Sequence, residues 1–574
     1  MENLAIARIF SEIADLLEIK SENPFKIRAY RNASETIAHA TDKLAYLGEE
    51  QLRAIPGIGK DLASKIREIA ETGEARYHQD LLQQFPPTIL DLLHLQGVGP
   101  KTVALLYTEL GVKTIEELEA ACSDGRVRAL KGLGPKKEQL ILRACAERKQ
   151  HTGRHLLPDA AEAARLLLEY LRAECPTVVF DYVGSIRRGA DTAGDIDILA
   201  TGRDPHVMST FTMYKLVERV LGHGETKSSV LLWGGIQADL RLVPEESRGA
   251  AMQYFTGSKS HNIALRDRAI ARGFKLNEYG LFRVDDGSLV AGRTEAEIYE
   301  ALGLVDIPAE LREGRGELEA AERRALPQLI RIEDICGDIH CHTTETDGRD
   351  DIEAMALAAR AAGLQYLAIT DHSKALAMAN GLDEHRALAH ATHIREISDR
   401  LDGITLLAGI ECDIRADGSM DLADDCLAEL DVVVASVHSA FNQDEAQMTD
   451  RMLRAIANPF VDIIGHPTGR ILLRRDPYKL DVGRLIAAAA AAGVALEINC
   501  QVDRLDLSDA HAKAARDGGA TVVISTDSHS KTAFAALRWG VQVARRAWLT
   551  KADVLNTRDV NGFRAGLRRN RRAT

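Results

Sequence analysis

The sequence contains no hydrophobic run long enough to cross a membrane, although 45% of its 574 residues are hydrophobic. A spanning helix needs about 18 or more consecutive apolar residues. The alanine-rich run 487–492 is short and ends at Gly493, so we interpret it as one helix of a folded domain. The first residues do not resemble a signal peptide. We therefore expect a protein of the cytoplasm with no membrane partner.

Paired cysteines are also missing. The eight cysteines include no Cys-x-x-Cys spacing, so the sequence suggests neither a zinc knuckle nor a disulfide framework. A reducing compartment fits this pattern.

The chain lacks an excess of positive charge. Its net charge of −13 argues at first against a nucleic-acid partner. Residues 1–150, however, carry 21 Lys and Arg against 22 Asp and Glu, so the acidic excess lies elsewhere. DNA binding would then rest on local backbone contacts and small basic clusters. One such cluster lies near the end of the chain, where it could contact phosphate or form a solvated, frayed tail: Arg564, Arg568, Arg569, Arg571 and Arg572.

A short glycine motif occurs three times in the first 155 residues. Each copy reads hydrophobic-x-Gly-hydrophobic-Gly and is followed by a polar stretch typical of a helix start. Glycines let a ligand approach the backbone, and a helix N-terminus attracts a phosphate. Three copies favour helix-hairpin-helix elements that grip DNA without reading its sequence, over glycines that only form tight turns between helices. The expected DNA contacts are Gly57, Gly59, Lys60, Gly97, Gly99, Lys101, Gly132, Gly134 and Lys136.

The central third carries carboxylates on predicted strands. Asp195 and Asp197 alternate on one strand and so lie about 7 Å apart on the same face. Asp239 has the same setting on a later strand. Such close carboxylates are costly unless a cation lies between them, and three of them can hold two Mg²⁺ or Mn²⁺ for phosphoryl transfer. The alternative is a solvated Asp-x-Asp on an edge strand.

The turn before this strand suits a triphosphate. Gly184 permits close backbone approach, Ser185 supplies a hydroxyl and Arg188 supplies a cation.

Seven β-type runs between residues 336 and 530 each end in polar residues, most of which are potential metal ligands. Helical patterns at 351–362, 383–401 and 480–492 alternate with these runs, which predicts a parallel sheet in a closed or nearly closed barrel. The ligands would then meet at the mouth where the strands end. Single histidines could instead be core residues, but the series predicts a multi-metal centre, formed by His340, His342, Asp347, His372, Glu411, His438, His466, Asp527 and His529. Mixed histidine and carboxylate ligands suit two to three Mn²⁺, Zn²⁺ or Fe²⁺.

Four other polar residues are placed by the same pattern. We expect Asn499 and Arg470 near the barrel mouth, facing substrate, and His393 and His511 on the surface of helices.

The central motif resembles the nucleotidyltransferase palm of family X DNA polymerases. The resemblance rests on Gly184-Ser185, on Asp195, Asp197 and Asp239, and on a later Tyr254-Phe255-x-Gly257 turn. It implies that these aspartates are catalytic and hold the metals. It also implies a deoxynucleotide site whose turn excludes ribose and whose Asn and Arg line the base-pair pocket, formed by Gly184, Ser185, Arg188, Gly194, Tyr254, Phe255, Gly257, Asn262 and Arg266.

Two departures from that family affect the palm. Ala193 stands where the vertebrate enzyme has a phosphate-binding Ser, and Gln237 stands where it has an Arg. We expect triphosphate binding to survive both.

The N-terminal segment resembles the small lyase domain of the same family. Lys65 falls at the position of its Schiff-base lysine, but Asp61 replaces a neighbouring basic residue. An unactivated lysine is a poor nucleophile near neutral pH. A lyase role and a simple DNA contact therefore both remain open for Lys65.

The series of strand-end ligands resembles the PHP (polymerase and histidinol phosphatase) domain. The whole chain is accordingly identified as similar to a bacterial-type family X DNA polymerase with a C-terminal PHP domain. This resemblance implies a multidomain α+β and α/β fold with a helical helix-hairpin-helix region, a palm with a thumb, and a (βα)7 barrel. We expect a lyase-like domain at 1–80, fingers-like hairpins at 81–155, the palm at 156–250, the thumb at 251–310, a helical linker at 311–333 and the PHP domain at 334–574.

The function implied is template-directed gap filling with dNTPs on gapped or primed DNA, coupled to a 3′–5′ exonuclease. AP endonuclease and 3′-phosphatase activities are family-level options, and the setting is DNA repair, including base excision repair. We expect the protein to be a monomer that interacts with other DNA repair proteins. The alternative is a PHP phosphoesterase acting on DNA ends with a template-independent or otherwise divergent nucleotidyltransferase.

Overall fold

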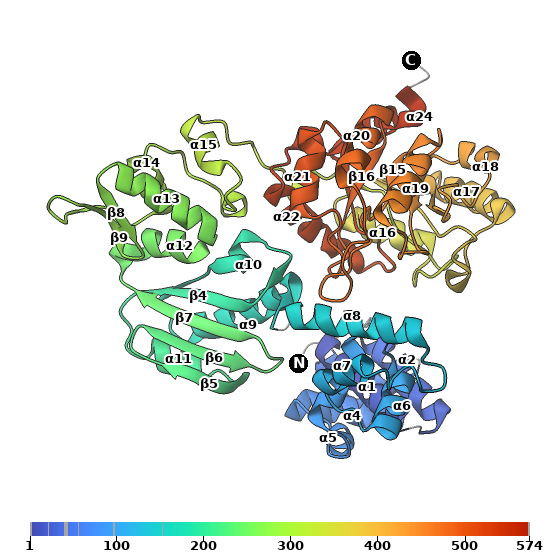
Figure 1. Cartoon of the computed structure of the whole chain (residues 1–574), viewed down its shortest axis with the longest axis horizontal. Coiled ribbons are helices and arrows are strands. Elements are labelled where there is room, and N and C mark those ends of the chain that lie inside the picture. Colours follow the sequence, from blue (N-terminus) through green and yellow to red (C-terminus); the bar gives the residue numbers. More distant parts are fainter. Residues whose placement is uncertain are drawn as a thin grey trace. The chain divides into compact units, whose positions relative to one another are not determined.

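The computed structural model of the chain describes residues 3–20, 22–38, 44–55, 57–95, 98–151 and 153–571. It forms two compact units, Met1–Thr152 and Gly153–Thr574 (Figure 1). Within the described ranges, no helix is both long and apolar enough to span a membrane.

The first unit is helical. Its α1 buries Ile6, Phe10 and Ile13 at three- and four-residue spacing, as the sequence pattern predicts. The helices described in this unit are α1 (Asn3–Ile19), α2 (Pro24–Ala38), α3 (Glu49–Arg53), α4 (Lys60–Thr72), α5 (Arg76–Leu82), α6 (Pro100–Leu110), α7 (Ile115–Ser123) and α8 (Pro135–His151), with 3-10 turns at Leu44–Tyr46 and Pro87–His94.

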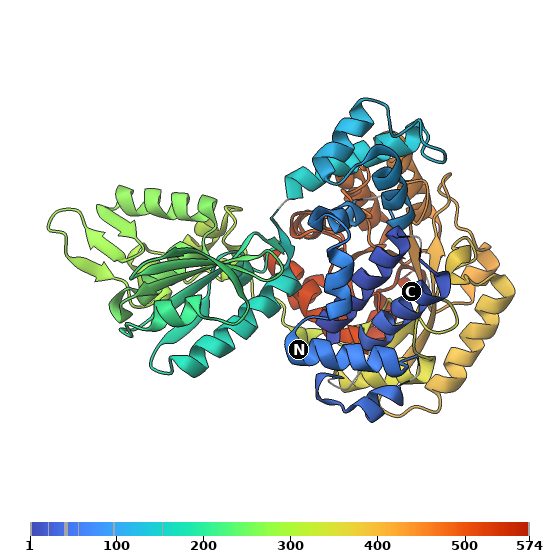
Figure 2. The same ribbon diagram turned by 90° about the horizontal axis from the view of Figure 1, so that it is seen from below.

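The second unit begins with a five-stranded sheet in the order β2-β4-β7-β6-β5. Its strands are β2 (Val179–Tyr182), β4 (Asp195–Thr201), β5 (Val217–His223), β6 (Lys227–Leu232) and β7 (Gln237–Val243). Helices α9 (Leu157–Glu174) and α11 (Val207–Thr212) pack on this sheet, as the teal and green ribbons in Figure 2 show. The neighbouring strands β4 and β7 run parallel and pair Asp197 with Asp239, which confirms the strand prediction for both carboxylates.

A smaller α+β layer follows the sheet. Its elements are α12 (Arg248–Thr256), α13 (Lys259–Ala271), β8 (Phe274–Asn277), β9 (Gly280–Arg283), β10 (Leu289–Ala291) and α14 (Glu295–Ala301). The three strands form an antiparallel sheet in the order β10-β9-β8.

The segment 311–333 differs from the helical linker predicted for it. It contains only α15 (Glu317–Glu322) and a 3-10 turn at Ile332–Asp334. Gly314 and Gly316 both have positive φ, which breaks the helix before α15. Arg312 and Glu317 are buried, so this charged segment packs into the layer of α13 and α14 through ion pairs.

The rest of the unit is a seven-stranded parallel sheet in sequential order, β11 to β17. The first and last strands approach at their carboxyl ends, where the amide of His342 donates to the carbonyl of Ser528 at 2.8 Å. All seven predicted runs therefore form strands of a nearly closed barrel: β11 (Gly337–Asp338), β12 (Tyr366–Ile369), β13 (Thr405–Asp413), β14 (Val432–Ser436), β15 (Ile463–Ile464), β16 (Ala495–Asn499) and β17 (Val522–Ser525).

Helices alternate with these strands, and apolar side chains pack between the two layers. The alanine-rich run lies at the end of α20, as predicted. The helices are α16 (Ile352–Ala361), α17 (Glu384–Ser398), α18 (Asp424–Ala428), α19 (Glu445–Ala457), α20 (Val482–Ala492), α21 (Asp509–Asp517), α22 (Leu537–Arg546), α23 (Val560–Gly566) and α24 (Arg568–Arg571).

Two arginines of the C-terminal cluster are not part of a frayed tail, so that expectation is wrong for them. Arg568 is buried and donates to the carbonyls of Ile456 and Asn458. Arg569 pairs with the buried carboxylate of Asp462 at 2.7 Å. Carbonyls and a carboxylate at the amino-terminal side of the barrel attract these cations more strongly than solvent does. Arg572 lies outside the described residues.

The eight cysteines are all free and seven are buried, as expected from the absence of paired spacing.

Candidate active sites

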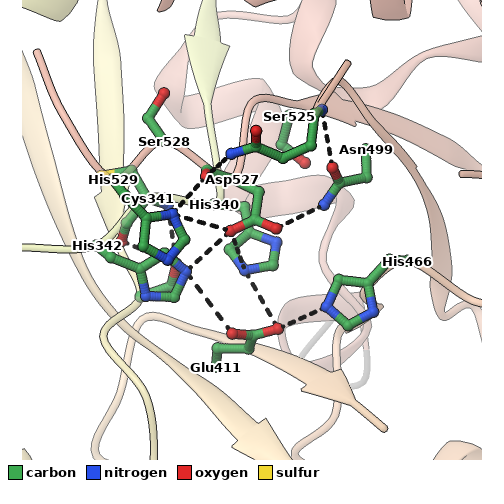
Figure 3. A network of polar contacts seen from close by, with 12 residues as sticks. His340, Cys341, His342, Glu411, His466, Asn499, Ser525, Asp527, Ser528 and His529 are labelled. Carbon is green, nitrogen blue, oxygen red and sulfur yellow. Dashed lines mark hydrogen bonds and ion pairs between the residues drawn. The ribbon is translucent and has the colours of Figure 1, made fainter. Parts of the chain in front are cut away.

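The predicted ligands of the barrel converge at the carboxyl ends of its strands. Figure 3 shows His340, His342, Glu411, His466, Asp527 and His529. His340 and His342 follow β11, Glu411 lies in β13, and Asp527 and His529 follow β17. Three groups have ligand atoms that all lie within 4.8 Å of one another: His342, Asp347, His372 and His529; His340, His342 and Asp527; and His372, Glu411 and His438. The groups share His342 and His372, so they form one continuous centre.

Glu411 lies at the middle of this centre. Its carboxylate is buried and faces five histidine rings. The nitrogen–oxygen distances are 2.8 Å to His372, 3.0 Å to His466, 3.4 Å to His340, 3.4 Å to His438 and 3.6 Å to His342. A carboxylate so placed could bridge ions, and the structure thus joins His466 to the other eight predicted ligands.

The charges of the centre are strongly coupled. Burial opposes ionisation of Glu411, but the neighbouring histidines hold its pKa well below the usual range. Burial would lower the pKa of His372, yet Glu411 and Asp347 raise it to about 10. Burial and the neighbouring rings of His529 and His372 lower the pKa of His342 to about 4. The centre therefore combines anionic oxygens with at least one neutral imidazole, which suits a divalent metal.

Unpaired nitrogen atoms support this fit. His340 Nε2 and His342 Nδ1 are buried and have no hydrogen-bond partner within the described part of the chain. A buried polar atom left unpaired is costly. His340 Nε2 lies 3.4 Å from Glu411 without meeting hydrogen-bond geometry, and a metal ion would supply a partner for both nitrogen lone pairs.

Carboxylates behind the ligands fix the orientation of two rings. Glu497 Oε1 lies 2.7 Å from His340 Nδ1, and Asp413 Oδ1 lies 2.7 Å from His438 Nδ1. Such partners hold the imidazole tautomer and raise ligand basicity. Sequence reasoning missed both roles, although Glu497 lies in β16, one of the predicted strands, and Asp413 lies on the same face of β13 as Glu411.

A further buried pair supports the loop after β12. Asp371 accepts from His390 Nε2 at 2.8 Å and from the amide and hydroxyl of Thr343. Asp371 precedes the predicted ligand His372, so this network fixes the chain next to that residue.

Asn499 and Arg470 do not face substrate in the way predicted. Asn499 is buried and donates to Glu497 and to Asp527, so it supports ligands from behind. Arg470 pairs with Asp191, in the turn that precedes β4, at 2.8 Å and donates to the carbonyls of Arg504 and Leu505. The partners of these two side chains come from neighbouring elements, and sequence periodicity does not reveal where those elements lie.

The two histidines predicted for helix surfaces differ from each other. His393 is exposed on α17, as expected. His511 in α21 is only partly exposed, and burial lowers its pKa.

The sheet carboxylates form the second candidate site. Burial first, and then the charges of Asp195 and Asp239, raise the pKa of Asp197 to about 7. Burial and Asp239 also raise the pKa of Asp195. A cation between the carboxylates would reverse this effect and favour their charged forms.

These carboxylates are less tightly gathered than the barrel ligands. They do not appear among the described groups whose ligand atoms all lie within 4.8 Å of one another. Asp239 is held instead by Gln237, whose Nε2 donates at 2.9 Å, and by Lys227 at 3.5 Å. Gln237 thus contacts the third aspartate directly.

Gly184 has a steric reason to be glycine. Its φ is +65°, and a Cβ atom there would lie 2.2 Å from Asp197 Oδ2. Ser185 and Arg188 follow in α10 (Gly184–Arg188), and both are partly buried. Arg188 Nε donates to Glu313 at 2.9 Å. Gly194 has open space around it, because its nearest neighbours would lie 3.9 Å from a Cβ atom.

The predicted sugar gate lies at the end of α12. The rings of Tyr254 and Phe255 pack edge to face at 5.1 Å, and Gly257 ends the helix with a φ of +69°. Asn262 donates from Nδ2 to the carbonyl of Tyr254 at 2.7 Å and so holds this turn. Arg266 is exposed one helical turn further on.

The three glycine motifs of the first unit have one local structure. In each, the hydrophobic residue between the glycines is buried, and its amide donates three residues back at 3.0 or 3.1 Å; these residues are Ile58, Val98 and Leu133. Gly59, Gly99 and Gly134 directly precede α4, α6 and α8. Lys60, Lys101 and Lys136 are exposed at these helix starts. The φ of Gly57 is +86° and that of Gly132 is +89°, whereas Gly97 lies outside the described residues.

Lys65 points along α4 toward Asp61, with Nζ 2.5 Å from Oδ1. The Lys65 amine is therefore engaged in an ion pair within its own helix. The pairing gives no support to a Schiff-base role.

Comparison with known proteins finds related domains in four parts of the chain. Family models match as the DNA polymerase beta thumb at residues 251–313, a helix-hairpin-helix domain at 1–75, a SAM-like helix-hairpin-helix tandem at 89–147 and the PHP domain at 338–501. The DNA polymerase/3′-5′ exonuclease PolX of Bacillus subtilis (strain 168) is 38% identical over 573 residues, which cover 99% of this chain and 100% of that protein. A "Probable phosphatase" of Shewanella sp. (strain ANA-3) is 36% identical over 203 residues, or 33% of this chain and 75% of that protein.

The thumb, the hairpins and the PHP barrel together define a polymerase class with a hydrolytic domain. The chain belongs to the PolX family of family X DNA polymerases with a C-terminal PHP domain.

Proposed function

We propose that this protein adds deoxynucleotides to a DNA 3′ end with its palm and removes nucleotides from the same kind of end with its PHP barrel. The observation that carries this proposal is the presence of both sites in a chain related over 99% of its length to a polymerase/3′-5′ exonuclease. One centre would build phosphodiesters and the other would hydrolyse them, as in repair of gaps and damaged bases.

In the palm, Asp195 and Asp197 would hold both metals, while Asp239 would hold the catalytic one and assist the primer hydroxyl. Two divalent ions, Mg²⁺ or Mn²⁺, stabilise the attacking and leaving oxygens when bound. The chain's own residues orient the nucleotide. Gly184 and Ser185 would meet the triphosphate, Arg188 would neutralise it, and the Tyr254–Gly257 turn would exclude a ribose 2′-hydroxyl.

In the barrel, the nine ligands would hold two to three Mn²⁺, Zn²⁺ or Fe²⁺. Such ions generate hydroxide near neutral pH and stabilise charge on a scissile phosphate. Glu497 and Asp413 orient the rings of His340 and His438, and Glu411 lies between the histidines.

The substrate would be gapped or primed duplex DNA, bound by a monomer. The three hairpins in the first unit offer helix N-termini and an exposed lysine each, which suits backbone phosphates rather than bases.

Primer extension tests the polymerase half. With dNTPs and a gapped template, we expect template-directed extension, and with NTPs we expect far less. Extension that does not follow the template would contradict the gap-filling proposal and favour a divergent nucleotidyltransferase.

A 3′-phosphatase activity of the barrel is a second candidate. The observation that favours it is the match between the PHP region and proteins named "Probable phosphatase". Release of inorganic phosphate from a 3′-phosphorylated primer, lost in His340→Ala with His342→Ala, would support it.

A further inference from the structure

One arginine of the PHP barrel contacts residues of the polymerase site. Arg546 ends α22, and its side chain is 7% exposed. Nη1 donates to the backbone carbonyl of Arg188 at 2.9 Å and to Glu313 Oε1 at 2.8 Å, while Nη2 pairs with Asp509 at 2.8 Å. Every contact is charge-assisted, and two of the three involve residues outside the barrel.

Glu313 is shared by two arginines. The same oxygen, Oε1, accepts from Arg546 and from Arg188 Nε at 2.9 Å. Arg188 also donates to the carbonyl of Thr256 at 2.5 Å, next to the predicted sugar gate. The guanidinium proposed to bind the triphosphate is thus held on a carboxylate that the barrel also holds.

Two further contacts fix the chain around Arg188. Arg470 of the barrel pairs with Asp191 at 2.8 Å. Gly189 packs so closely against Gln542 of α22 that a Cβ atom would lie 2.0 Å from Gln542 Nε2. The turn after α10 therefore contacts the barrel through both Gly189 and Asp191.

The charges of Glu313 and Arg546 affect how strongly Arg188 can attract a nucleotide. Glu313 alone would neutralise Arg188 and compete with the incoming triphosphate for its guanidinium. A second cation on the same oxygen draws the carboxylate charge toward itself and leaves more positive potential at Arg188. Asp509, which also pairs with Arg315 at 3.0 Å, holds the other end of Arg546.

We propose that Arg546 is a positioning residue of the polymerase site, supplied by the PHP barrel, which shares Glu313 with Arg188 and so leaves more of the positive charge of Arg188 available to the triphosphate. This inference rests on the proposed role of Arg188. It assigns the barrel a part in nucleotide affinity that is separate from its own metal chemistry.

The test is steady-state insertion of one nucleotide into a gapped duplex by the full chain. For Arg546→Gln we expect KM for the dNTP to rise about tenfold, equivalent to about 1.4 kcal/mol, with kcat within about twofold. Arg546→Lys should recover part of the affinity, because a cation is restored. Exonuclease activity should remain at the wild-type level.

The matched control is Arg545→Gln. Arg545 is the preceding residue of α22 and also pairs with a glutamate outside the barrel, Glu310 at 2.8 Å, but its partner does not contact Arg188 in any described interaction. We expect its KM to stay at the wild-type value. An equal rise in both variants would overturn the proposal, since it would show a general effect of weakening the packing of α22.

A double-mutant cycle isolates the pathway through Glu313. In a Glu313→Gln background, Arg546→Gln should leave KM unchanged, because no shared carboxylate remains. The same tenfold effect in that background, or an unchanged KM for Arg546→Gln alone, would overturn the inference. Failure of the wild-type chain to insert any nucleotide would instead contradict the proposed function.

Discussion

Replacement of Glu497 by Gln should weaken metal binding in the barrel without touching a ligand. Four groups face this carboxylate: His340 Nδ1 and the Ser525 hydroxyl on Oε1, and the His466 amide and Asn499 Nδ2 on Oε2. All four donate when His340 presents Nε2 to a metal. The amide of Gln accepts on one side only, so either orientation turns its NH₂ group against two donors.

The expected loss follows from the role of His340. Outer partners of ligating histidines typically contribute about 10- to 100-fold in metal affinity. We expect the Mn²⁺ concentration that half-activates 3′-end degradation to rise by about that factor, and excess Mn²⁺ to restore much of the rate. Gap filling by the same variant should not change.

Asp462→Asn is the matched control for this variant. Asp462 is also a buried barrel carboxylate surrounded by donors, but it pairs with Arg569 beside the start of β15, at the end of the barrel away from the ligands. The Asp462→Asn variant should lower thermal stability and leave the half-activating Mn²⁺ concentration unchanged. An unchanged curve for Glu497→Gln, or an equal shift in both variants, would refute the assigned role of Glu497.

Three other outcomes are expected. Gly184→Ala should lower kcat for insertion by about 100-fold or more, because its Cβ atom would displace Asp197 and a shift of about 1 Å can have that effect; unchanged insertion kinetics would contradict this reading of the turn. Glu295→Gln should destabilise the thumb by about 3 kcal/mol near pH 7, because Arg187 and Arg312 outweigh burial and lower the pKa of Glu295 from 4.5 to about 2. The difference in stability between wild type and Glu295→Gln, measured by thermal melting, should be constant above about pH 5. It should shrink as the pH falls from 4.5 toward 2, because a lowered pKa stabilises only the ionised state. A difference that grows in acid would contradict this prediction. Replacing Lys60, Lys101 and Lys136 together by Ala should weaken binding to gapped DNA and reduce the slope of log affinity against log salt by up to about 3, as anisotropy titrations would measure, whereas an unchanged slope would exclude these phosphate contacts.

The barrel centre could be predicted because each potential ligand lies in or next to a strand that the sequence itself predicts. Parallel strands end at one mouth, so a potential ligand just after each strand is enough to bring His340, His372 and Glu411 together. The pairing of Asp197 with Asp239 follows similarly from alternation on two strands.

The supporting residues could not be predicted in the same way. Glu497 is the partner of His340 only because β16 lies where it does in the barrel. Arg470, Arg568 and Arg569 looked like surface or substrate residues, yet each finds a carboxylate or carbonyl from a distant segment. The helical pattern of 311–333 failed where Gly314 and Gly316 adopt positive φ and where Arg312 and Glu317 find buried partners.

The most direct test of two opposed activities in one chain is a pair of double variants assayed on one gapped, labelled duplex. Asp195→Ala with Asp197→Ala should abolish gap filling and retain 3′-end degradation, while His340→Ala with His342→Ala should do the reverse. Loss of both activities in either double variant, or 3′-end degradation that persists without the two histidines, would contradict the assignment of synthesis to the palm and hydrolysis to the barrel.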